Sequence, residues 1–114
     1  MELSKRDKKI ARQIIEKGLQ KEYVQGLSEI DSILNDWKNT KRDNRESYQL
    51  LYRKLINIDK NIARRYNNMS GSKYFLIIVG QLLDEIITES DLDELSDESR
   101  QKVMLYIKIT REHQ

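Results

Sequence analysis

Residues 74–87, YFLIIVGQLLDEII, decide the fold. Six apolar residues stand in a row at 74–79, and leucine and isoleucine then recur at spacings of three and four through Leu82 and Ile86. This spacing indicates a helix, and the unbroken run makes its first turns apolar nearly all round. A helix of this kind must be enclosed on several sides, so the rest of the chain has to cover it.

The composition favours an all-α protein. The 114 residues include no proline and only four glycines, and 35% are charged while 38% are hydrophobic, which is typical of amphipathic helices. A chain of this length predicts a single helical domain over residues 1–114. Because cysteine is absent, a disulfide framework and thiolate chemistry are excluded.

The composition also bears on location. Residues 1–10 are basic and lack the apolar core of a signal peptide. The longest apolar run, at 74–80, is far shorter than the roughly 20 residues that span a bilayer. We therefore expect a cytoplasmic protein without a membrane span. Isoleucine far outnumbers alanine, which suits an AT-rich genome and indicates a bacterial or phage source.

The periodicity predicts four helices, of which the first is the longest. Ser4 can cap a helix that runs to Trp37, about 50 Å at 1.5 Å per residue. Its apolar residues fall on two different faces, with the change near Gly18. One long bent helix that contacts different partners at its two ends is the interpretation we favour, and a break at Gly18 is the alternative.

The second helix is predicted to lie antiparallel to the first. Asp43 can cap it, with Glu46 completing a capping-box pattern, and it should end near Asn67 or Asn68. Its apolar residues recur at spacings of three and four and form one stripe: Tyr48, Leu51, Tyr52, Leu55, Ile58, Ile62 and Tyr66. Tyrosine and tryptophan at helical spacing are more often in the core or at its margin than at an interface.

The other two helices are shorter. The third, buried and apolar, should run to Ile87 from a cap at Ser70 or Ser72. A short turn capped by Thr88 or Ser90 should then bury two leucines, Leu92 and Leu95. Ser96 can cap the fourth helix, whose first turn carries acidic residues that suit the helix dipole.

Asp59 is the one candidate for a buried polar group. It falls inside the apolar stripe of the second helix, where a carboxylate is costly unless it is paired or hydrogen-bonded. Pairing with a neighbour, or rotation to the margin of the stripe, is the simpler explanation. A pocket carboxylate with a raised pKa would make the chain a carboxylate-based enzyme, but no second catalytic group stands nearby.

Charge is strongly segregated along the chain. Residues 74–99 carry eight acidic side chains and no basic one, whereas the segments on either side carry an excess of basic residues. On the second helix, Arg53, Lys60 and Arg64 cluster opposite the apolar stripe, where they could contact phosphates or a partner protein. An ordinary solvated helix face is the simpler interpretation, since no nucleic-acid motif accompanies them.

The acidic run provides a candidate partner surface rather than a metal site. Its spacing fails the calcium loop of an EF-hand, because the position that requires glycine is Ser96 and the position that requires glutamate is Lys102. His113 is the only histidine. We therefore expect no metal and no cofactor. The acidic candidates are Asp91, Asp93, Glu94, Asp97 and Glu98.

These observations favour a non-catalytic helical module that binds another protein. Nucleic-acid binding through Arg53, Lys60 and Arg64 is the alternative, and a carboxylate-based enzyme around Asp59 is a distant third. The first helix is longer than the later helices can cover, so we also expect a homodimer in preference to a compact monomer broken at Gly18.

Overall fold

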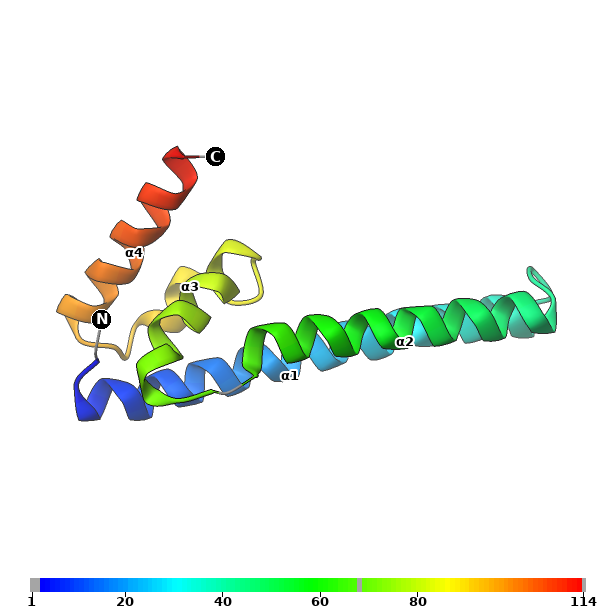
Figure 1. The fold of residues 1–114 in the computed structure, drawn as a ribbon, viewed down its shortest axis with the longest axis horizontal. Helices are drawn as coiled ribbons and strands as arrows, with labels where there is room; N and C mark the ends of the chain where they lie inside the picture. Colours follow the sequence, from blue (N-terminus) through cyan, green and yellow to red (C-terminus); the bar gives the residue numbers. More distant parts are fainter. Residues whose placement is uncertain (1–2, 68, 114) are drawn as a thin grey trace. The chain divides into compact units, whose positions relative to one another are not determined.

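The computed structural model describes residues 3–67 and 69–113, and helices account for 82% of them, with no strand among these residues. The all-α class is therefore confirmed (Figure 1). The described residues form four α-helices, α1 (Lys5–Lys38), α2 (Asn44–Tyr66), α3 (Tyr74–Leu83) and α4 (Asp97–Glu112), and two short 3-10 turns, η1 (Gly71–Lys73) and η2 (Glu89–Leu92).

The helices group into two compact units. Unit 1 comprises Met1–Leu19 and Asn68–Gln114, and unit 2 comprises Gln20–Asn67. Helix α1 is unbroken and contributes its first half to unit 1 and its second half to unit 2. The continuous first helix is therefore confirmed, and the alternative break at Gly18 is wrong. The single-domain assignment stays a prediction.

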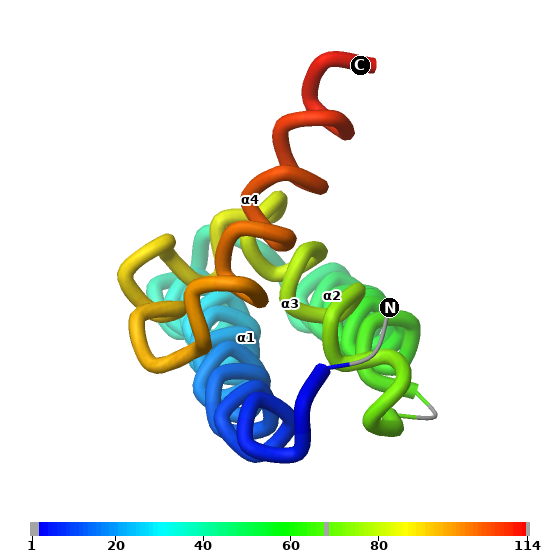
Figure 2. Tube along the Cα trace, turned by 90° about the vertical axis from the view of Figure 1, so that its left-hand side faces the viewer, coloured from blue at the N-terminus to red at the C-terminus, as the bar shows by residue number. Residues whose placement is uncertain are grey.

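In unit 1, α3 packs on the first half of α1 (Figure 2). Gln81 is fully buried, and its Nε2 donates to the backbone carbonyl oxygen of Ile15 at 3.1 Å. Gly18 makes this approach possible, because a Cβ there would lie only 2.8 Å from Cδ of Gln81. The glycine that suggested a helix break is instead the place where a buried side chain meets α1.

The core of unit 1 is assembled from all its helices. Helix α3 is buried on most sides, as the sequence predicted, although Leu76 is 55% exposed. The turn η2 and the residues that follow it place Leu92 and Leu95 in the core, also as predicted. Other buried apolar side chains come from α1 and α4: Ala11, Ile14, Ile15, Val103 and Ile107.

Helix α3 ends earlier than the sequence predicted. It stops at Leu83, because Glu85 adopts a left-handed conformation with φ of 59°. The amide of Ile86 then donates to the carbonyl of Gln81, and that of Glu85 to Leu82, which is the Schellman pattern of helix termination. The beginning differs too: Lys73 is the N-cap, and neither predicted serine donates or accepts a capping bond there.

The predicted caps of the other helices are correct. The hydroxyl of Ser4 accepts from the amide of Asp7, and that of Ser96 from the amide of Ser99. In α2, the carboxylate of Asp43 accepts from the amide of Glu46 at 2.7 Å. Helix α2 ends at Tyr66, as expected from the following asparagines, of which Asn68 lies outside the described residues.

Unit 2 is an antiparallel hairpin of α2 and the second half of α1 (Figure 1). The contacts between the two helices are nested, from Trp37 with Asn44 near the turn to Glu22 with Arg65 at the far end. Midway, Gly26 faces Ile58, and a Cβ at Gly26 would lie 3.0 Å from Cγ2 of Ile58. Nested pairs of this kind require the helices to run in opposite directions.

Helix α1 ends with the same motif as α3. Thr40 has φ of 56°, its amide donates to the carbonyl of Trp37, and the amide of Lys41 donates to that of Asp36. The left-handed position of a Schellman motif is usually glycine, because a Cβ costs about 1–2 kcal/mol there. A β-branched threonine is especially unfavourable at positive φ.

Replacing these residues by glycine should therefore stabilise the protein. We expect Thr40→Gly and Glu85→Gly each to raise the free energy of unfolding by about 1 kcal/mol, measured by urea denaturation followed by circular dichroism. Lys38→Gly, in the last turn of α1, is the control and should lower it by about 1 kcal/mol. A loss of stability in Thr40→Gly would contradict the assigned helix end.

Candidate protein interaction site

The carboxylate singled out by the sequence is not buried. Asp59 is exposed, so the prediction of a buried polar group there is wrong. The reason is the rotation of α2: the residues that face α1 are Ser47, Leu51 and Ile58, and Asp59 lies about 100° further round the helix. An exposed carboxylate on an apolar face offers no enclosed site for acid–base chemistry.

The basic candidates lie together on α2. Arg53, Lys60 and Arg64 are all exposed. Lys60 and Arg64 border a polar groove of about 550 Å³, which is also lined by Glu29 and Lys54. Polar side chains line most of the groove. Its basic residues lie on α2, and Glu29 of α1 partly balances their positive charge.

The acidic candidates do not form one free surface. Asp91 is half-buried, and Nζ of Lys17 on α1 donates to it at 2.5 Å. This bond, with a second from the amide of Thr88, lowers the pKa of Asp91 to about 2. The remaining four, Asp93, Glu94, Asp97 and Glu98, are exposed.

A buried carboxylate that the sequence did not reveal is Asp7. Its side chain accepts hydrogen bonds from the amide of Ser96 at 3.0 Å, from the Ser96 hydroxyl at 2.5 Å and from the Ser99 hydroxyl at 2.6 Å. Burial by itself raises the pKa of Asp7, but these hydrogen bonds outweigh it and the pKa lies below the ordinary 3.8. The first turn of α1 thereby holds the first turn of α4.

Unit 2 carries the largest set of exposed apolar side chains. On α1 all of them except Val24 lie within about 80° of one another, next to the line that faces α2, and on α2 they lie within about 60° of one another. In an antiparallel hairpin both lines point to the same side. We call this surface the apolar face, and it consists of Tyr23, Leu27, Leu34, Trp37, Tyr48, Tyr52 and Leu55, each between 37% and 72% exposed.

Near the turn, the exposed apolar side chains of α1 and those of α2 line the same groove. Leu34 and Trp37 from α1 and Tyr48 and Leu51 from α2 line one groove of about 250 Å³. The hydroxyl of Ser47 is buried beside it and has no hydrogen-bond partner within the described parts of the chain. The apolar face is therefore continuous across the seam between α1 and α2 near the turn.

The opposite edge of the same seam is polar. Ion pairs join α1 to α2 and to the turn along this edge: Glu22 with Arg65 at 3.4 Å, Glu29 with Lys54 at 3.8 Å and Asp36 with Arg42 at 2.8 Å. The hairpin thus has two unlike sides, one with charges satisfied inside the chain and one with uncovered apolar side chains.

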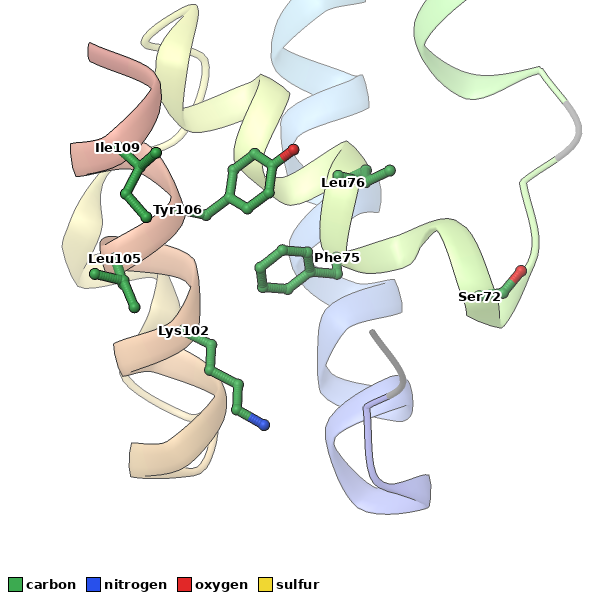
Figure 3. A pocket seen from close by; sticks show the side chains of 7 residues that line it. All are labelled: Ser72, Phe75, Leu76, Lys102, Leu105, Tyr106 and Ile109. Carbon is green, nitrogen blue, oxygen red and sulfur yellow. The ribbon is translucent and has the colours of Figure 1, made fainter. Parts of the chain in front are cut away.

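Unit 1 also has an apolar groove, between α3 and α4 (Figure 3). Phe75 and Tyr106 meet edge to face, with ring centroids 5.7 Å apart, and Lys102 stands at one end. The groove measures about 280 Å³ and is lined by Ser72, Phe75, Leu76, Lys102, Leu105, Tyr106 and Ile109.

No metal-binding group of three or more histidine, cysteine, aspartate or glutamate side chains occurs within residues 3–67 and 69–113. Among the same residues, no helix combines the length and apolar character needed to cross a membrane.

Comparison with protein-family models, with curated proteins and with solved structures finds no match to this chain. The candidate site therefore rests on the geometry of its residues. The apolar face is the strongest candidate, because its exposed side chains are the most numerous and lie on one side of the hairpin.

The Asp7 network should contribute measurably to stability. An asparagine would present an amide to the donors Ser96 and Ser99, so we expect Asp7→Asn to lower the free energy of unfolding by about 1–3 kcal/mol at pH 7. The ionised carboxylate of Asp7 contributes its full stabilisation of the folded state above pH 3.8. This stabilisation is lost as the pH falls through the lowered pKa of Asp7 in the folded state. Wild-type stability should therefore fall more steeply below about pH 4 than that of the variant.

Denaturation from pH 7 to pH 2 measures both effects. The exposed Asp93→Asn is the control and should change stability by less than about 0.5 kcal/mol. Equal stabilities of Asp7→Asn and Asp93→Asn at pH 7 would show that the carboxylate of Asp7 does not hold α4.

Proposed function

We propose that this chain is a non-catalytic helical module that binds another protein through the apolar face of unit 2. The observation that carries the proposal is the exposure of aromatic and aliphatic side chains along both helices of one hairpin, for example Leu27 at 66% and Tyr48 at 72%. Tyrosine and tryptophan are the side chains that most often dominate binding energy at protein interfaces.

The size of the apolar face supports this proposal. With about 150–250 Å² for each large side chain, the exposed fractions of its seven residues correspond to roughly 700 Å² of surface. The largest apolar patch on a typical monomer is about 300–600 Å², and larger ones mark interaction sites. A stable protein interface buries about 800 Å² on each partner.

The polar edge of the hairpin strengthens the same argument. Glu22, Glu29 and Asp36 are already paired with basic side chains of unit 2, so that edge needs no partner. The apolar face has no corresponding cover among the described residues, since its side chains remain exposed with the whole described chain present. Covering it with a partner removes apolar surface from water, which favours association.

Charge introduced on the apolar face should abolish binding. We expect Leu27→Glu combined with Tyr48→Glu to lose the partner that the wild type captures from the native host, measured by affinity capture and mass spectrometry. The matched control is Ser32→Glu combined with Asn57→Glu, which adds the same charge to exposed positions away from the face. Identical capture by the two double variants would contradict the proposal.

Nucleic-acid binding is the second candidate, and the exposed cluster of Arg53, Lys60 and Arg64 favours it. If these three side chains contact phosphates, the logarithm of the binding constant should fall with the logarithm of salt concentration, with a slope near −2.7 for duplex DNA.

Fluorescence anisotropy with labelled duplex DNA and single-stranded RNA separates the two candidates. The protein-binding proposal predicts no difference between the wild type and the triple variant Arg53→Ala, Lys60→Ala and Arg64→Ala. A steep salt dependence that the triple variant loses would favour nucleic-acid binding instead.

A further inference from the structure

We infer that the occupant of the apolar face is a second copy of this chain, packed with two-fold symmetry and with the turns of the two hairpins at opposite ends. This inference rests on the proposed function, because it names the partner of the same face. In this arrangement each helix of one hairpin lies antiparallel to its own counterpart, and the two hairpins pack face to face as a four-helix bundle.

The shape of the face favours a second hairpin. Its apolar side chains lie on two antiparallel helices and extend from Tyr23 to Trp37 on α1 and from Tyr48 to Leu55 on α2. A single helix laid in the groove would cover the seam, whereas these side chains occupy the lines on either side of the seam, on both helices. A second two-helix hairpin with the same spacing covers both lines at once, and two-fold pairing closes the assembly.

The charges of the face favour opposite orientation of the two turns. Arg45 and Asp59 are exposed on the same side of α2 as the apolar face, and neither forms an ion pair with a described residue. Each lies seven residues from Tyr52, about 10 Å along the helix in opposite directions. A two-fold axis at Tyr52 therefore places Arg45 of each copy against Asp59 of the other.

The same two charged residues disfavour the alternative arrangement, in which the turns of the two hairpins lie at the same end of the dimer. That arrangement would set α2 against α1 of the other copy, and Asp59 would meet the region around Tyr23 and Leu27, which supplies no cation to the face. A carboxylate covered by apolar side chains without a partner is strongly unfavourable. The position of Asp59 within an apolar stripe is explained if Arg45 of a second copy neutralises it.

Single cysteines test the predicted axis directly, because the chain has no cysteine of its own. Under mild oxidation, Tyr52→Cys should form a disulfide-linked dimer, since residues at a two-fold axis lie beside their own copies. Ser32→Cys, exposed on the far side of α1, is the matched control and should stay monomeric on a non-reducing gel. Equal cross-linking of the two variants would overturn the arrangement.

Reversing the charges of Arg45 and Asp59 tests their pairing between the two copies independently. These variants leave the apolar residues of the interface unchanged. Sedimentation equilibrium should show the dimer dissociation constant raised at least tenfold in Arg45→Glu and in Asp59→Arg, and restored within about threefold in the double variant. Single reversals that weaken the dimer without restoration in the double variant would overturn the orientation.

The outcomes also separate this inference from the proposed function. A wild-type mass of 13.6 kDa at all concentrations would overturn the second copy as occupant. If the same monomer still captured a different protein, and Leu27→Glu with Tyr48→Glu abolished that capture, the apolar face would remain a protein-binding site. A monomer without face-dependent capture would contradict both.

Discussion

The unequal cover of helix α1 is the constraint on which the structure depends. Its first half is enclosed in unit 1, where Ala11, Ile14 and Ile15 are buried, whereas its second half is covered in unit 2 by α2 alone. A two-helix hairpin can bury only the lines along which its helices touch. The apolar side chains on the adjoining lines, such as Leu27, remain exposed, and a partner is the physical means of covering them.

The two halves of α1 are held in different ways. In unit 1, side chains distant in sequence bind its backbone or its own polar groups: Gln81 donates to the carbonyl of Ile15, and Ser96 and Ser99 donate to Asp7. In unit 2, ion pairs lie along one edge of the seam and apolar contacts along the other. The first arrangement fixes a packed core, and the second leaves one side of the hairpin suited to association.

The helix caps could be predicted from the sequence, because they depend on residues that are close together in the chain. Ser4, Asp43 and Ser96 cap helices as their spacing indicates, because each cap involves residues only three positions apart. The network of Asp7 could not be predicted, since its partners lie about 90 positions away in the sequence. Asp59 is exposed because of the way α2 is rotated about its own axis. The sequence could not predict this rotation, because a wide apolar stripe does not specify which part of it faces α1.

Residue-resolved amide hydrogen exchange at two protein concentrations, tens of nanomolar and hundreds of micromolar, measures whether a second copy covers the hairpin. Amides of residues 20–67 should exchange more slowly at the higher concentration, because association through the apolar face stabilises the hairpin. Amides in the core of unit 1 should be much less affected. Exchange in residues 20–67 that is the same at both concentrations would contradict association of two copies through the apolar face.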